Sequence, residues 1–152
     1  MTDPEARIRS FLSKYQPAVA ADLSAARAWL KDFFPRGFEL VYDNYNALAI
    51  GFAPTARAST AIVSVAAYPK WVTLFFLHGR DLEDPQGLLQ GAGARVRSIR
   101  LQPMTLLESR PVRALVLQAI RPHQPALAAA PPLTTLVKSV SAKQRSRRPG
   151  SA

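Results

Sequence analysis

The chain has 152 residues, of which 48% are hydrophobic and none is cysteine. This length and composition predict one globular domain and exclude disulfide-stapled scaffolds, thiolate metal centres and cysteine nucleophiles. The formal net charge is +10, and all 10 Asp and Glu residues precede Pro122, so the chain beyond it is purely basic. The first residues carry no basic-then-apolar signal, and no apolar run approaches the roughly 20 residues of a membrane span. We therefore expect a cytoplasmic protein without membrane contact.

Helical periodicity opens the chain. Asp3-Pro4 is typical of a helix start, and apolar residues recur at helical spacing through residues 8–15. Gln16-Pro17 interrupts this pattern, and a second apolar face follows through residues 19–33 until Pro35 ends it. The pattern predicts two helices joined at a proline corner.

A strand-like pattern follows, with turn residues between the segments. Asp43-Asn44 and Pro69-Lys70 predict turns, and residues 79–93 predict a long loop. The five predicted strands are Phe38 to Tyr42, Ala47 to Phe52, Ala61 to Tyr68, Trp71 to His78 and Arg95 to Leu101.

The chain after the strands divides at Pro122. Residues 112–120, entered through Pro111, have the apolar spacing of a helix. We therefore expect an α+β domain over residues 1–122, with an N-terminal helix pair and a C-terminal helix packed on one mainly antiparallel sheet of about five strands, in the order α-α-β-β-β-β-β-α. The Pro/Ala-rich basic composition of residues 123–152 predicts a disordered tail. Within it, Leu133, Leu136, Val137 and Val140 have helical spacing, which predicts at most a short helix docked on the body or on a partner.

Several of these features resemble the YdhG-like family of uncharacterised bacterial domains over roughly Ile8 to Arg121. They are the opening helix pair, the turn Tyr42-Asp43-Asn44-Tyr45, the I-G-F strand end, the W-V-T-L-F-F-L strand, and the D-P-x-G-L-L-x-G-x-G loop that leads into R-x-I-x-L. The chain departs from the family at Ala94 and Ser98, where members often carry a lysine and a histidine. The resemblance implies helices packed on an antiparallel sheet and no assigned activity, although one relative has been proposed as a frataxin-like iron chaperone.

The Tyr-Asp-Asn-Tyr turn is the best candidate for a ligand site, because aromatic and polar groups gather at one end of the predicted sheet. The candidate ligand-binding residues are Tyr42, Asp43, Asn44, Tyr45, Trp71, His78 and Arg97. Turn and core chemistry explain most of these residues equally well. The glycine loop of residues 87–93 with the arginines behind it could cradle an anion, or it could simply need positive φ angles.

Metal and catalytic chemistry have less support. His78 and His123 are the only histidines, and the acidic residues that follow His78 lack calcium-loop spacing. No motif of a hydrolase nucleophile is present, so we expect no catalytic residue, resident metal or cofactor. An enzyme would require Asn44, Tyr45 and His78 to converge in one cleft.

The sequence therefore predicts a non-catalytic module that binds a small ligand or a protein. The alternatives are frataxin-like iron handling and nonspecific nucleic-acid binding through the tail, whose basic residues are Lys143, Arg145, Arg147 and Arg148. Exposed Trp71 or Phe75 could also support a homodimer.

Overall fold

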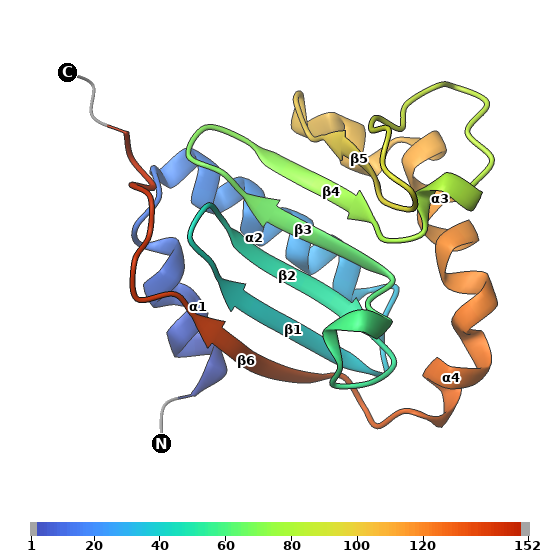
Figure 1. Ribbon diagram of the computed structural model, residues 1–152, viewed down its shortest axis with the longest axis horizontal. Helices are drawn as coiled ribbons and strands as arrows, with labels where there is room; N and C mark the ends of the chain where they lie inside the picture. The colour runs from blue at the N-terminus through green and yellow to red at the C-terminus, as the bar shows by residue number, and fades with distance from the viewer. Residues whose placement is uncertain (1–2, 150–152) are drawn as a thin grey trace.

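The computed structural model describes residues 3–149, which form one sheet with helices behind it (Figure 1). In chain order the elements are α1 (Pro4–Leu12), α2 (Pro17–Lys31), β1 (Phe38–Asp43), β2 (Leu48–Ala53), β3 (Val63–Ala67), β4 (Val72–Phe76), β5 (Arg97–Arg100), α3 (Arg110–Ile120), α4 (Gln124–Ala129) and β6 (Thr134–Val140). Within this part of the chain, no helix combines the length and apolar character that a bilayer crossing requires.

The sheet has six strands in the order β5-β4-β3-β2-β1-β6. Neighbouring strands are antiparallel except for β6, which runs parallel to β1. The register aligns one inward residue from each of the first five strands in a single buried row: Val41, Ile50, Val65, Leu74 and Ile99. This row packs into the core with the apolar faces of α1 and α2, which lie behind the sheet.

The opposite face of the sheet carries small residues on its central strands β2 and β3, and none of the helices α1 to α4 covers it (Figure 1). The alternate positions of β2 and β3 on this face are Ala49, Gly51, Ser64 and Ala66. Only the connection between β2 and β3 folds over one end of it. We refer to this side as the open face.

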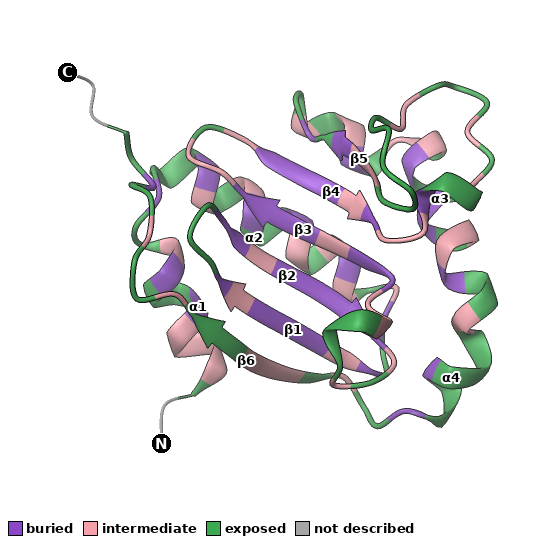
Figure 2. Ribbon diagram, in the orientation of Figure 1, coloured by how far each residue is buried: buried purple, intermediate pink, exposed green. Residues whose placement is uncertain are grey.

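The general α+β prediction is confirmed, and the predicted helix pair, five strands and later helix all form. The sheet is mainly antiparallel, as predicted, but it has six strands rather than about five, and the additional strand β6 is parallel to β1 and follows α3 and α4 in the chain. Figure 2 shows that burial is concentrated in β1 to β4, whereas β6 lies more exposed at one edge.

The prediction of a disordered tail is wrong for residues 123–149. Residues 124–129 form α4, and Thr134–Val140 form a strand rather than the expected short helix. The reason is that β1 offers an unpaired edge, and the β-branched residues of this segment suit a strand that pairs with it. Pro122 is therefore not the end of the domain, because β6 belongs to the same sheet. Residues 150–152 of the predicted tail lie outside the described part.

Candidate functional site

The predicted Tyr-Asp-Asn-Tyr turn joins β1 to β2, and its aspartate points inward. Asp43 alternates with Val41 on the core side of β1 and is fully buried. The Lys14 Nζ donates to Asp43 Oδ2 at 2.5 Å, and the Arg147 guanidinium donates to Asp43 Oδ1 at 2.9 Å. Burial alone would raise the pKa of Asp43, but these hydrogen bonds outweigh it and hold the pKa below its usual value.

Arg147 fastens the C-terminal segment to this turn. Its guanidinium also donates to the carbonyl oxygens of Asn44 at 2.5 Å and Tyr45 at 3.0 Å, and only 3% of the residue is exposed. The backbone N–H of Arg145 donates to the same Tyr45 carbonyl at 2.8 Å. The turn is therefore held by a segment about a hundred residues later in the chain.

A second buried carboxylate on β1 repeats this arrangement. Glu39 accepts hydrogen bonds from Arg27 of α2 at 2.6 and 2.8 Å and from the Thr135 hydroxyl of β6 at 2.7 Å. Each carboxylate of β1 thus connects an N-terminal cation with the C-terminal segment. Sequence reasoning missed these pairs, although an inward acid on a core strand needs a cationic partner and only basic residues follow Pro122.

A groove of about 570 Å³ lies on the open face, on the other side of the sheet from these two buried carboxylates. Its floor is made of small residues of β2 and β3, including Ala49, Ser64 and Ala66. Aromatic rings line it as well, from Tyr45 in the turn, Tyr68 at the end of β3 and Phe75 in β4. Leu77 and Val96 line its far end.

The groove combines exposed apolar surface with nearby positive charge. Tyr45 and Val96, which are 43% and 41% exposed, are two of the four exposed large apolar residues of the described chain. The Arg145 guanidinium lies 5.7 Å from the centre of the Tyr45 ring. Trp71 stacks on Tyr68 with the ring centres 5.7 Å apart, and the Arg100 guanidinium lies 3.8 Å from the Trp71 ring. No Asp or Glu lines the groove.

The structure brings together some of the predicted site residues. Asn44 and Tyr45 line the groove directly, and Trp71 supports one edge through Tyr68. Tyr42 is next to Ala49 in the register, and its hydroxyl is buried without a hydrogen-bond partner. Burial also raises the pKa of Tyr42.

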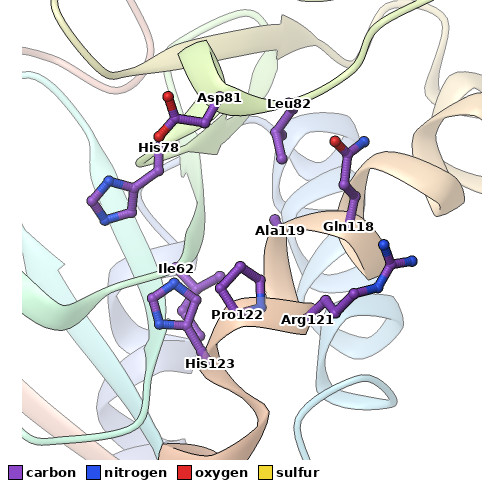
Figure 3. A pocket seen from close by; sticks show the side chains of 9 residues that line it. All are labelled: Ile62, His78, Asp81, Leu82, Gln118, Ala119, Arg121, Pro122 and His123. Atoms are coloured by element: carbon purple, nitrogen blue, oxygen red, sulfur yellow. The ribbon is translucent and has the colours of Figure 1, made fainter.

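His78 lies elsewhere, in a second cavity of about 410 Å³ (Figure 3). There its ring faces that of His123, with the ring centres 6.1 Å apart and the planes 26° from parallel. Burial lowers the pKa of His123, and the neighbouring His78 lowers it further. Asn44, Tyr45 and His78 therefore do not converge in one cleft, as an enzyme built on them would require.

Arg97 is engaged by its own loop. Its guanidinium donates to the carbonyl oxygens of Gly93 at 2.7 Å and Val96 at 2.8 Å. Gly87 and Gly91 of this loop do adopt positive φ angles, as the purely conformational interpretation of the glycines expects. Arg97 therefore holds the end of this loop in place through its hydrogen bonds to the loop backbone.

Among residues 3–149, no group of three or more His, Asp or Glu side chains is placed to hold a metal ion. Comparisons with protein-family models, curated proteins and solved structures gave no match to this chain.

Proposed function

We propose that the chain is a cytoplasmic YdhG-like domain that acts as a non-catalytic binding module, and that the groove on its open face holds a small ligand or a segment of a protein. The observation that carries this proposal is the combination of a floor of small residues with exposed aromatic walls. The features that support the YdhG-like resemblance include the turn at one end of this groove. The α+β fold is compatible with the one that the resemblance implies.

The surface of the groove favours binding. Exposed large apolar side chains that gather in one concavity mark interaction sites on soluble proteins. Tyr45 and Val96 lie at the two ends of the groove, and small side chains between them leave its floor open. Aromatic walls supply contact area, while Asn44 and Ser64 add a few polar groups that could orient a ligand.

The groove is also held in place before any ligand arrives. The Arg147 guanidinium binds two carbonyl oxygens of the turn and the buried Asp43 carboxylate at once. A site whose walls are fixed in advance loses less conformational entropy on binding. The hydrogen bonds of Arg147 thus fix the turn that lines the groove, although Arg147 itself does not line it.

The alternatives gain no comparable observation. Iron handling would need a cluster of carboxylate or histidine ligands, and none forms in the described part of the chain. A free basic tail is not what residues 123–149 provide, since Arg147 is buried and Arg148 donates to carbonyl oxygens of Ser13 and Lys14. A homodimer through Trp71 or Phe75 stays a prediction.

The proposal can be tested by filling the groove. An apolar anionic dye such as anilinonaphthalene sulfonate should bind the wild-type protein and fluoresce. Ala49→Phe, on the floor, should abolish that binding, because the larger ring occupies the groove. Ala25→Phe is the matched control, since Ala25 lies on α2 beside a different cavity. Equal dye binding by all three proteins would contradict the proposal.

A further inference from the structure

Three aromatic side chains line the groove, those of Tyr45, Tyr68 and Phe75. Tyr45 projects from the turn with 43% of its surface exposed, and Phe75 lines the groove from β4. Tyr68 and Trp71 form a stacked pair, with 27° between the ring planes. Rings arranged on an open sheet can stack against the bases of a single-stranded nucleic acid.

The charge beside these rings is positive. Arg145 lies over the Tyr45 ring and Arg100 over the Trp71 ring, while no carboxylate lines the groove. The two acids of β1, Glu39 and Asp43, face the other side of the sheet and are paired with cations there. The groove therefore attracts anions, and the net charge of +10 strengthens that attraction.

The residues that line the groove come from several neighbouring strands. The groove runs from the turn at Tyr45 across β2 and β3 to Leu77 and Val96 beyond β4. Arg145 and Arg100 flank its first end, and Arg95 precedes Val96 at the other. Positive charge at both ends suits a chain that carries negative charge at regular intervals.

From these observations we propose that the groove binds single-stranded nucleic acid, with bases stacked on Tyr45 and Phe75 and phosphates paired with Arg100 and Arg145. This inference rests on the proposed role of the groove as a binding site, and it names a ligand class beyond the small ligand or protein segment of that proposal. An acidic peptide would satisfy the charge but not the flat aromatic surfaces. A duplex would bind less tightly, because its bases are already stacked on one another.

The test is a titration of the full chain into a fluorescently labelled oligothymidylate of about ten nucleotides, followed by anisotropy. Tyr45→Ala should weaken binding about tenfold through the loss of one stacked base, whereas Tyr45→Phe should retain it. The control is Leu117→Ala, because Leu117 on α3 is similarly exposed but lies outside the groove. The Leu117→Ala protein should bind the oligonucleotide as tightly as wild type does. Arg100→Gln should reduce the slope of affinity against salt.

The outcomes separate this inference from the proposed function. If Tyr45→Ala binds as tightly as wild type and inorganic polyphosphate competes fully, charge alone is responsible and the inference is overturned. If the oligonucleotide fails to bind while the naphthalene sulfonate dye still does, the inference falls and the proposed function survives. If a polyglutamate peptide displaces the oligonucleotide and Tyr45→Ala weakens the binding of that peptide, the groove belongs to an acidic protein partner and the inference is overturned. Failure of both dye and oligonucleotide would overturn both proposals.

Discussion

At the scale of single residues, the pairing of Asp43 with Arg147 decides the shape of the turn. The carboxylate is fully buried and the arginine almost so, and the same guanidinium satisfies two turn carbonyls. Removing one partner of a buried ion pair leaves the other charge without compensation, which costs more than the pair itself contributes.

Arg147→Gln should therefore lower the free energy of unfolding by about 3 kcal/mol, measured by urea denaturation at neutral pH. Arg148→Gln serves as control, because Arg148 is exposed and makes only long hydrogen bonds to carbonyl oxygens. Its loss should change stability by no more than about 0.5 kcal/mol. Equal stability of the two variants would contradict the role assigned to Arg147.

The histidine cavity predicts a dependence on pH. Burial lowers the pKa of His123, so the folded state resists its protonation more than the unfolded state does. Its contribution to stability is complete above the ordinary histidine value of about 6.5 and is lost as the pH falls below it.

His123→Gln should accordingly lose less stability than wild type between neutral pH and about pH 5. Melting temperatures of both proteins across this range would measure the difference. A wild-type curve that runs parallel to that of the variant would show that His123 does not carry this dependence.

At the scale of elements, β6 completes the sheet. It covers the edge of β1, donates a hydrogen bond to Glu39 through Thr135, and leads into the segment that carries Arg147. Without β6, β1 would be an open edge strand with two buried carboxylates that have lost part of their pairing.

A chain that ends after residue 133 should thus fail to fold cooperatively or should melt far below wild type. A chain that ends after residue 149 keeps β6 and Arg147 and is the matched control. Differential scanning calorimetry of the two truncations distinguishes this account from a disordered tail, for which both truncations would leave melting unchanged.

The segment 134–140 also shows where sequence reasoning reaches its limit. Local periodicity located the first five strands well, because each alternates or is bounded by turn residues. The apolar spacing of residues 133–140 fits a helix, whereas its pairing with β1 depends on an edge almost a hundred residues earlier. No local pattern reveals such a long-range partner.

At the scale of the whole molecule, α1 and α2 lie behind the sheet and α3 and α4 lie at one side of it, which leaves the open face to the groove (Figure 1). Asn44 and Tyr45 were predicted as candidate ligand-binding residues because aromatic and polar side chains that gather in one turn can be recognised in the sequence. Floor residues such as Ala49 and Ala66 were missed, since small residues carry no such signal. The structure places His78 in the second cavity although its neighbour Leu77 lines the groove, so these two consecutive side chains point to different cavities.

The most direct test of the account is an NMR titration of the ¹⁵N-labelled protein with the naphthalene sulfonate dye. The proposed groove predicts that amide shifts change in the turn 44–47, in the floor strands β2 and β3, and around Phe75 and Val96. Changes confined instead to the histidine cavity around His78 and His123, or to the helices behind the sheet, would contradict the assignment of the open face as the binding site.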